Sequence, residues 1–420
     1  MTKDVDRRVQ FMGDRYLFYK EPVSIESGEG VWLKDKSGNK YLDVYNNVPV
    51  VGHCHPKVVA SLKEQASKLN IHSRYISDVV VDYSEKLVSK HAKELTRLKM
   101  ACSGTEAVEL ALRMARVYTG GEGIICSSST YHGNSFETIR MTVGPFEPEF
   151  RRVPYPQTFR PDKLGLSEEE LTEFYVEKIS EQIKAFKKDG IKFAGLIFCS
   201  IFANEGLPNF SKDYLSKASK LVREAGGVVI LDEVQAGFGR TGTWWGYELS
   251  DLVPDICVMG KPMGAGIPVS GVVSSTEISD DFHQKWSYFN TTAATPVQAA
   301  VGSTVIDIIE EENLIQNAKK VGAYLKKQLD ELQEKYEFIG DVRGPGLFLG
   351  LEVIDNKEDK NPDKTLAENL VESLKEKYFL ISNAGEHRNV LKLRPPLVFD
   401  ISHADLLLDA LDDSFKKISS

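Results

Sequence analysis

No apolar run in this sequence reaches about 18 residues, the length that a membrane-spanning helix needs. The first ten residues, MTKDVDRRVQ, also lack the apolar segment of a secretory signal peptide. The chain contains no internal repeat and no low-complexity tract. These absences lead us to expect a soluble protein located in the cytoplasm.

Cysteine is scarce, and positive charge is not in excess. The cysteines are odd in number and spread along the chain: Cys54, Cys102, Cys126, Cys199 and Cys257. This pattern favours reduced, mostly buried thiols over a disulfide framework. A formal net charge of −9 gives no overall attraction to nucleic acid or to anionic membranes, so we expect neither as a partner.

Apolar residues, by contrast, are plentiful. They make up 42% of the 420 residues, which is enough to bury a substantial core. From about residue 57, segments of helical spacing alternate with short apolar runs, which lie at 97–104, 123–129, 194–200, 227–233 and 255–260. This alternation predicts an α/β fold in which helices cover both faces of a mostly parallel sheet.

Polar residues appear where these predicted strands end: Ser103, Ser127, Asp232 and Lys261. Ligands bind at the carboxyl ends of the strands in such sheets, so these residues mark a candidate site. Lys261 stands out because it follows the buried run ICVMG and precedes the small residues of PMGAG.

Three interpretations of Lys261 compete. A P-loop lysine fails, because that motif needs a glycine where this chain has Asp255 and a serine or threonine where it has Pro262. An ion pair with Asp232 is the second interpretation, since a carboxylate at the end of a buried strand needs a partner. Covalent chemistry at the amine is the third, and the lysine alone does not decide between these two.

A third segment, ACSGTEAVELALR at 101–113, reads as a strand, a small-residue turn and the start of a helix. The amides of Gly104 and Thr105 would face an anion at the positive end of that helix. The alternative is an ordinary helix cap by Ser103 or Thr105. Together, an anion cup, a carboxylate and a lysine are what pyridoxal phosphate requires.

The chain resembles a known family over nearly its whole length. It is similar to the class III aminotransferases, which are fold-type I enzymes dependent on pyridoxal 5′-phosphate. The segments that carry the resemblance are YLDVYNNVPVVGHCHP (41–56), SGTEAVELALRMAR (103–116), TYHGNS (130–135), DEVQAGFGRTG (232–242), MGKPMGAGIPVSGV (259–272) and FNTTAATP (289–296). The resemblance implies a large domain at 56–308 with a mostly parallel sheet. It also implies a smaller α+β domain at 309–420, which the N-terminal segment 1–55 joins.

The resemblance also implies a role for individual residues. Lys261 would form the Schiff base with the cofactor and move the substrate proton. Asp232 would keep the pyridine nitrogen protonated, Gln235 would bond the phenolic oxygen, and Tyr131 would stack on the ring. His132 would shape the turn that carries Tyr131.

The cofactor phosphate would be held by Gly104 and Thr105, and by Thr291 of a neighbouring subunit. A homodimer with shared active sites is therefore implied. The chain departs from the family at TTAATP (291–296), where TFGGNP is more usual, and this departure bears on Thr291.

Two histidines flank a cysteine in GHCHP (52–56), which raises the question of a metal site. Adjacent ligands do not easily converge on one ion, and no complementary cluster of ligands is present in the sequence. The family has a similar GHxHP turn, so we expect a structural turn and no metal.

Substrate recognition is expected at NVLKLRPPLVF (389–399), where family members often have an arginine for a substrate carboxylate. This chain has Lys392 there and Arg394 two residues later, so strand alternation predicts both side chains on one face. Arg74 in NIHSRY would add a third cation. Glu205 lies where ω-aminotransferases have a glutamate that pairs with the substrate arginine.

These features most resemble the branch that contains alanine–glyoxylate aminotransferase-like proteins and phosphoethanolamine phospho-lyases. The resemblance implies an aminotransferase that moves an amino group from a primary amine or amino acid to a keto acid. That reaction would follow a ping-pong cycle through the pyridoxamine form. The alternative is a phospho-lyase for a phosphoethanolamine- or phosphohydroxylysine-type amine. A non-catalytic binding protein is a third hypothesis, which the presence of both Lys261 and Asp232 disfavours.

Overall fold

A seven-stranded sheet forms the centre of the molecule. The computed structural model describes residues 3–13, 16–142 and 148–419. The strands of this sheet run in the order β4-β10-β9-β8-β7-β5-β6. Their bounds are β4 Arg97–Ala101, β5 Gly123–Ser127, β6 Phe150–Val153, β7 Phe193–Cys199, β8 Val228–Asp232, β9 Ile256–Met259 and β10 Ser270–Ser274.

The sheet is mostly parallel, as the alternating sequence pattern predicted. Strands β6, β5, β7, β8 and β9 pair in parallel, and only β10 pairs antiparallel, with both β9 and β4. Runs such as FAGLIFC in β7 and VVILD in β8 are buried along their whole length. Such continuous burial is typical of strands covered on both faces.

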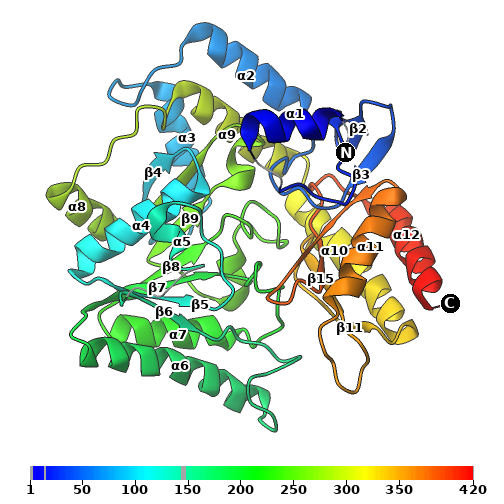
Figure 1. Ribbon diagram of the computed structural model, residues 1–420. Coiled ribbons are helices and arrows are strands. Elements are labelled where there is room, and N and C mark those ends of the chain that lie inside the picture. The colour runs from blue at the N-terminus through cyan, green and yellow to red at the C-terminus, as the bar shows by residue number, and fades with distance from the viewer. Residues whose placement is uncertain (1–2, 14–15, 143–147, 420) are drawn as a thin grey trace.

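Helices cover both faces of the large sheet. They are α1 Lys3–Met12, α2 Pro56–Lys68, α3 Asp78–Val88, α4 Gly104–Thr119, α5 Phe136–Ile139, α6 Glu168–Lys188, α7 Asp213–Glu224, α8 Thr276–Lys285, α9 Pro296–Glu311, α10 Leu314–Lys335, α11 Lys364–Glu376 and α12 Ile401–Ser419, with short 3₁₀ turns η1 Gly246–Ser250 and η2 Lys261–Gly264. Helix α4 packs on one face of the large sheet, and α6 and α7 pack on the other (Figure 1). None of the helices in the described ranges has the combination of length and apolar character needed to span a membrane.

Helix α4 matters most for the site, and its sequence explains both of its ends. Ser103 precedes the helix in an extended conformation, and its hydroxyl accepts a hydrogen bond from the amide of Glu106. Gly120 ends the helix in the left-handed conformation. Helix α4 therefore begins directly after β4, which is an outermost strand of the large sheet.

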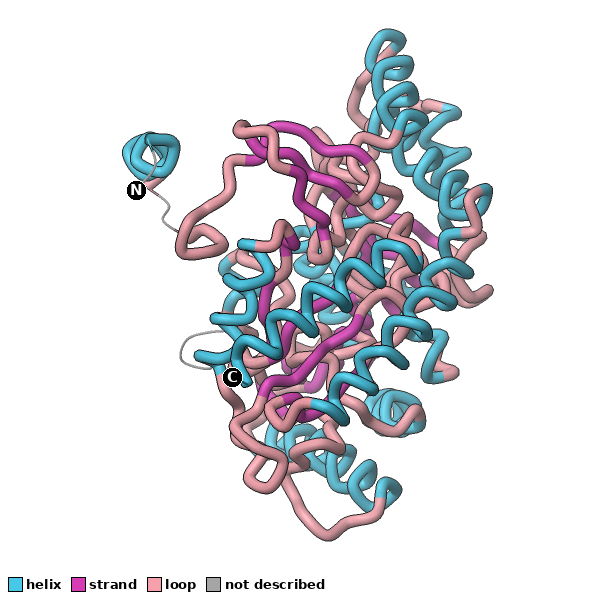
Figure 2. Tube along the Cα trace, turned by 90° about the vertical axis from the view of Figure 1, so that its right-hand side faces the viewer, coloured by secondary structure: helices cyan, strands magenta, loops and turns pink. Residues whose placement is uncertain are grey.

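Two smaller sheets join the chain termini to the rest. The first sheet has the strand order β1-β2-β3-β13, and the second has the order β11-β12-β15-β14. The bounds of these strands are β1 Ile25–Glu29, β2 Trp32–Asp35, β3 Lys40–Asp43, β11 Ile339–Arg343, β12 Leu349–Val353, β13 Phe379–Leu380, β14 Ser382–Ala384 and β15 Val390–Leu393. Strand β13 pairs in parallel with β3, so the C-terminal part of the chain extends the N-terminal hairpin. Figure 2 shows α1 at the edge of the molecule, near this hairpin.

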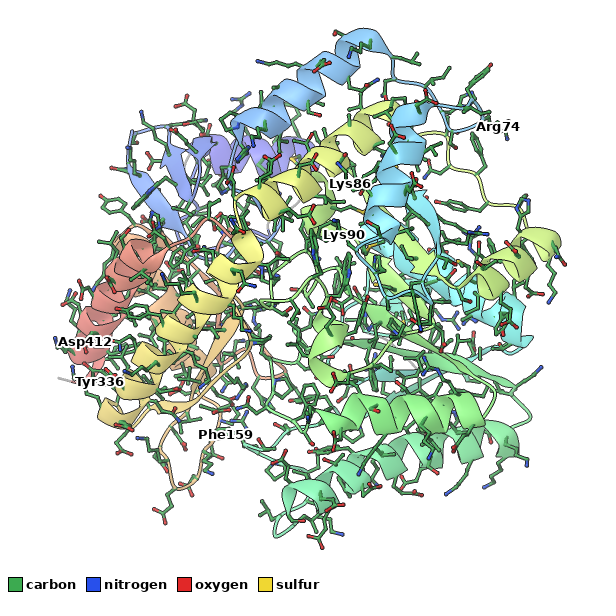
Figure 3. The ribbon with its side chains drawn as sticks, turned by 180° about the vertical axis from the view of Figure 1, so that it is seen from behind. Arg74, Lys86, Lys90, Phe159, Tyr336 and Asp412 are labelled. Carbon is green, nitrogen blue, oxygen red and sulfur yellow. The ribbon has the colours of Figure 1, made fainter. Side chains whose placement is uncertain are left out.

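Helices α2, α3 and α9 pack together beside the large sheet. Ion pairs join α3 to α9, where Lys86 meets Asp307 at 2.8 Å and Lys90 meets Glu310 (Figure 3). These pairs are partly exposed, so their contribution to stability is small beside that of the buried apolar contacts.

Glycine allows the C-terminal helices to approach the site closely. A Cβ atom on Gly322 of α10 would lie 2.1 Å from the carbonyl oxygen of Gly346. Gly346 has a φ of +57°, and its own Cβ would lie 2.5 Å from the carbonyl oxygen of Arg240. The helix, the turn before β12 and the loop after β8 are thus in direct backbone contact.

The Gly322→Ala variant tests this contact. The added methyl group has no space against a rigid carbonyl, so we expect a loss of stability of about 1–3 kcal/mol. Differential scanning calorimetry should show a melting temperature lower by several degrees. The control is Ala323→Ser, an exposed position on the same helix, which should melt like the parent. An unchanged melting temperature for Gly322→Ala would contradict the close approach.

Candidate active site

The carboxyl edge of the large sheet brings together the residues that the sequence singled out. Asp232 ends β8, and it pairs with Val258 on β9 and with Cys199 on β7. Lys261 follows two residues after the end of β9 and begins η2. Asp232 and Lys261 therefore share one edge, as parallel pairing requires.

Lys261 borders the space beside Asp232, Gln235, Lys392 and Arg394, which we call the recess. Its side chain is exposed to solvent, yet burial of its surroundings lowers the pKa of its amine, and the positive charge of Arg394 lowers the pKa further. Both facts hold together when a side chain lines a cavity rather than the outer surface. Among the described residues, no carboxylate lies within salt-bridge distance of this amine. A lysine with a lowered pKa is neutral more often and is therefore a better nucleophile and base.

Asp232 is held from behind by a buried histidine. The Nδ1 atom of His132 lies 2.7 Å from Oδ2 of Asp232, and its Nε2 atom lies 2.7 Å from Oγ1 of Thr130. The other carboxylate oxygen accepts the amide of Val234 at 3.0 Å. With Asp232 ionised, Nδ1 carries the proton and donates it, while Nε2 accepts from the threonine hydroxyl. This chain of hydrogen bonds holds the carboxylate in a fixed orientation.

The neighbouring carboxylate of Glu233 has a different role. It accepts the amides of Gly246 at 2.7 Å and Tyr247 at 2.9 Å, inside the core. Burial raises the pKa of Glu233 to about 7. Of the two adjacent acids in the sequence, Asp232 therefore faces the site and Glu233 anchors η1.

The start of α4 forms an anion cup. Ser103 caps the helix through Glu106, as one interpretation of the sequence predicted, but this leaves the amides of Gly104 and Thr105 unused by any residue in the described ranges. The Thr105 hydroxyl donates to Oδ1 of Asn134 at 3.1 Å. A Cβ on Gly133 would lie 2.7 Å from that same hydroxyl, so the turn 130–135 closes tightly over the helix start. These free amides fit a phosphate group.

Tyr131 and Gln235 are connected through Asn204, which the sequence analysis did not identify. The Asn204 side chain donates to the Tyr131 carbonyl at 3.1 Å and accepts from Nε2 of Gln235 at 3.0 Å. The Gln235 oxygen Oε1 then accepts from Lys392 at 3.4 Å and from Arg394. No motif marked Asn204, because its partners lie far from it in the sequence.

Lys392 and Arg394 do lie on one face, as strand alternation predicted. Both are buried, and both lie over the ring of Phe348, at 5.4 and 5.3 Å from its centroid. Burial lowers the pKa of Lys392 well below its ordinary value, and the adjacent Arg394 lowers it further. Neither makes a salt bridge with a carboxylate among the residues that the structure describes. The two cations share only the neutral oxygen of Gln235.

Glu205 is buried near this pair without bonding to it. Its Oε1 accepts a hydrogen bond from Ser127, and its Oε2 has no hydrogen-bond partner. Burial raises the pKa of the Glu205 carboxyl. Its charge acts on Lys392 through space, so the residue belongs to the same recess.

Arg74 and Thr291 lie outside the cluster. Arg74 is exposed on the loop between α2 and α3, at the edge of the molecule, with its guanidinium 3.9 Å from the ring centroid of Phe289 (Figure 3). Thr291 is exposed on the loop between α8 and α9, in a surface pocket of about 630 Å³ that Cys102 also lines. Their assigned roles stay predictions, and both would have to be fulfilled at another subunit.

The two histidines of GHCHP bind separate partners. His53 contacts Asp43 at 2.7 Å, whereas His55 caps α2 and contacts Glu312 at 3.1 Å. The motif thus shapes a turn whose two side chains reach different parts of the molecule.

With this geometry in view, the chain can be compared with known proteins. Residues 18–415 match the family described as aminotransferase class-III. The chain is 37% identical to alanine–glyoxylate aminotransferase 2 homolog 2, mitochondrial, from Arabidopsis thaliana, over 99% of this chain and 87% of that protein. It is 35% identical to ethanolamine-phosphate phospho-lyase homolog 1 from Caenorhabditis elegans, over 98% and 94% of the two. A phospholyase from Arthrobacter, solved in complex with phosphoethanolamine, superposes with a TM-score of 0.95 at 39% identity and 99% coverage of both chains.

The Lys261→Ala variant tests the central assignment. The unaltered protein, incubated with pyridoxal phosphate and reduced with borohydride, should carry a covalent adduct on the peptide that contains Lys261. We expect the variant to lose the adduct and its absorbance at ~400 nm, because Lys261 is the amine that shares the carboxyl edge of the large sheet with Asp232. Lys392→Met is the matched control and should keep the adduct. A variant that still forms it at full yield would refute the assignment.

Proposed function

The chain belongs to the class III aminotransferase family of enzymes dependent on pyridoxal phosphate, and we propose that it eliminates phosphate from a small, phosphorylated primary amine. The observation that carries this proposal is the pair Lys392 and Arg394, whose only shared acceptor within the described part of the chain is the neutral oxygen of Gln235. Two buried cations without a carboxylate partner need an anion. A phosphate monoester supplies nearly two negative charges at neutral pH, whereas a carboxylate supplies one.

The chain's own residues account for each step. When bound, the cofactor supplies an electron sink for the carbon that bears the substrate's amino group. Lys261 removes the proton from that carbon, and its lowered pKa favours the neutral amine that this step needs. The bond between the adjacent carbon and the ester oxygen of the phosphate then breaks, and its electron pair leaves with the phosphate. Water later releases ammonia and an aldehyde, so no keto acid is consumed.

The remaining polar residues hold the reacting groups in place. Asp232, oriented by His132, would stabilise a protonated ring nitrogen. The second N–H of Gln235, which Asn204 leaves free, would reach the phenolic oxygen. Lys392 and Arg394 would bind the phosphate of the substrate through charge-assisted hydrogen bonds. The amides of Gly104 and Thr105 would hold the cofactor's own phosphate, so the two anions occupy different cups.

Two relatives support this choice. The names of the Arthrobacter and C. elegans proteins assign them phospholyase activity, and the former was solved with phosphoethanolamine. Phosphoethanolamine is therefore the first substrate to test, although the chemistry requires only a primary amine with a phosphate on the adjacent carbon.

Transfer of the amino group to a keto acid is the second candidate, and Glu205 favours it. An aminotransferase binds two different substrates in turn at one site. The Oε2 atom of Glu205 has no hydrogen-bond partner among the described residues, and the carboxylate lies close enough to act on the charge of Lys392. Glu205 would therefore balance the charge of that lysine when the bound substrate has an uncharged end. The Arabidopsis relative is named an aminotransferase. Nothing in the recess favours a non-catalytic protein.

We also propose that the enzyme is a homodimer with shared active sites. Apolar side chains are exposed on the two loops that carry Arg74 and Thr291: Tyr75, Ile76, Trp286 and Phe289. A second copy of the chain would cover them and bring Thr291 to the partner's cofactor phosphate.

The five cysteines are free, which suits a reducing cytoplasm, although the Arabidopsis relative is named mitochondrial.

Phosphate release distinguishes the two activities. We expect the cofactor-loaded enzyme to release inorganic phosphate, ammonia and acetaldehyde from phosphoethanolamine without any keto acid, because elimination needs no acceptor. A molybdate assay and a coupled aldehyde assay measure the products. Lys261→Ala is the control and should release nothing. Product formation only when a keto acid is added, with no phosphate released from any phosphorylated amine, would establish aminotransfer instead.

Light scattering tests the dimer. We expect a mass near twice 46.9 kDa for the unaltered chain. Ile76→Glu puts a charge on the exposed apolar loop and should shift the mass toward one copy, with weaker cofactor retention. Leu164→Glu, at another exposed apolar position, should stay dimeric. A monomer at all concentrations in the unaltered protein would refute the shared site.

A further inference from the structure

One residue of the GHCHP turn is connected to the substrate recess. The turn after β3 is built around Asp43, which is fully buried. Its carboxylate accepts the amides of Tyr45 at 3.0 Å and Asn46 at 2.9 Å, and the Asn46 side chain at 3.1 Å. Each of these contacts comes from an N–H donor, so the carboxylate holds the residues of this turn together.

His53 completes this arrangement. Its Nε2 lies 2.7 Å from Oδ2 of Asp43 and donates to it. Its backbone exchanges two hydrogen bonds with Gly30, at 2.8 and 3.1 Å. A Cβ added to Gly28 would lie 2.9 Å from the Cβ of His53, so the histidine is also packed tightly from the side. The imidazole is thus fixed in position against the carboxylate.

The same turn holds Arg394. The Arg394 amide donates to the carbonyl of Val44 at 2.7 Å, and Nε donates to the carbonyl of Tyr45 at 3.1 Å. The guanidinium lies 5.0 Å from the centroid of the Tyr45 ring. Val44 thus holds the backbone of Arg394, while Tyr45 on one side and Gln235 on the other hold its guanidinium. The position of Val44 and Tyr45 depends on the Asp43 carboxylate.

We propose that His53 is a positioning residue for the substrate anion. By holding Asp43, it fixes the turn at 44–46, and the carbonyls of that turn aim Arg394 at the anion. This inference rests on the proposed function, because it requires that Arg394 bind a substrate phosphate. It gives the histidine an effect on substrate binding although it touches neither substrate nor cofactor.

The expected consequence is specific. Without the His53 ring, Asp43 keeps its three other donors, so the turn should stay folded but move more freely. Lys261 and Asp232 lie on the large sheet and do not depend on this turn. The affinity for the anion should therefore fall while the chemistry at the amine-bearing carbon continues. A misplaced anion ligand would weaken binding by about tenfold.

Steady-state kinetics with phosphoethanolamine, and competitive inhibition by inorganic phosphate, test the proposal. For His53→Ala we expect KM and the phosphate inhibition constant to rise about tenfold, with kcat within about twofold of the unaltered enzyme. His53→Gln keeps an N–H donor at the same reach and should restore both constants. His55→Ala is the matched control from the same motif, and it should leave both constants unchanged.

Two further variants separate this inference from the proposed function. Arg394→Gln and Lys392→Met should each weaken phosphate inhibition. If neither does, the anion site itself is wrong and the positioning role falls with it. If Arg394→Gln weakens inhibition and His53→Ala does not, only the positioning role is refuted. A loss for His53→Ala that appears in kcat alone, or that His53→Gln fails to restore, would also refute it.

Discussion

Positive charge that is buried without a carboxylate partner is the constraint on which this structure depends. Lys392 and Arg394 are buried, and the exposed side chain of Lys261 lies near them. Burial lowers the pKa of all three groups, and repulsion by neighbouring positive charge lowers the pKa of the two lysines further. The same repulsion has two uses. It leaves Lys261 uncharged more often, so that it can attack and remove protons, and it makes the recess attractive to an anion. A carboxylate placed against these cations would remove both properties.

Gln235 is the point at which the two halves of the site meet. Its oxygen faces the cations from the C-terminal sheet, and its NH₂ group faces Asn204 beside the large sheet. The amide thus presents its acceptor to the two cations and its donors to Asn204. Through Asn204 the connection continues to the backbone of Tyr131. An anion that draws Lys392 and Arg394 away from Gln235 would therefore act on the residues that surround the cofactor.

Local sequence patterns predicted much of this site. Buried runs followed by single polar residues identified Asp232 and Lys261, because parallel strands end at a common edge. Alternation along a strand placed Lys392 and Arg394 on one face. The small-residue turn before α4 indicated an anion cup, and the structure shows that the Ser103 cap and the free amides coexist. Asn204 was not recognised, since its contacts with Gln235 and Tyr131 span 31 and 73 positions of sequence. The link from Asp43 and His53 to the recess was not recognised either, since it passes through the contact of Tyr45 with Arg394, which spans 349 positions.

The sequence by itself determined the α/β fold, the mostly parallel sheet and the chemical types of the residues at its carboxyl edge. These properties follow from hydrophobic periodicity and from motifs in which neighbouring residues act together. Only the tertiary structure decided which charges remain unpaired, because Asp232 is bound by His132, Glu233 by the amides of η1, and Glu205 by Ser127. Whether a charged side chain finds a partner depends on distances of a few ångströms between residues that are far apart in the sequence. A net charge of −9 gave no sign that the recess at the centre of the molecule would be positive.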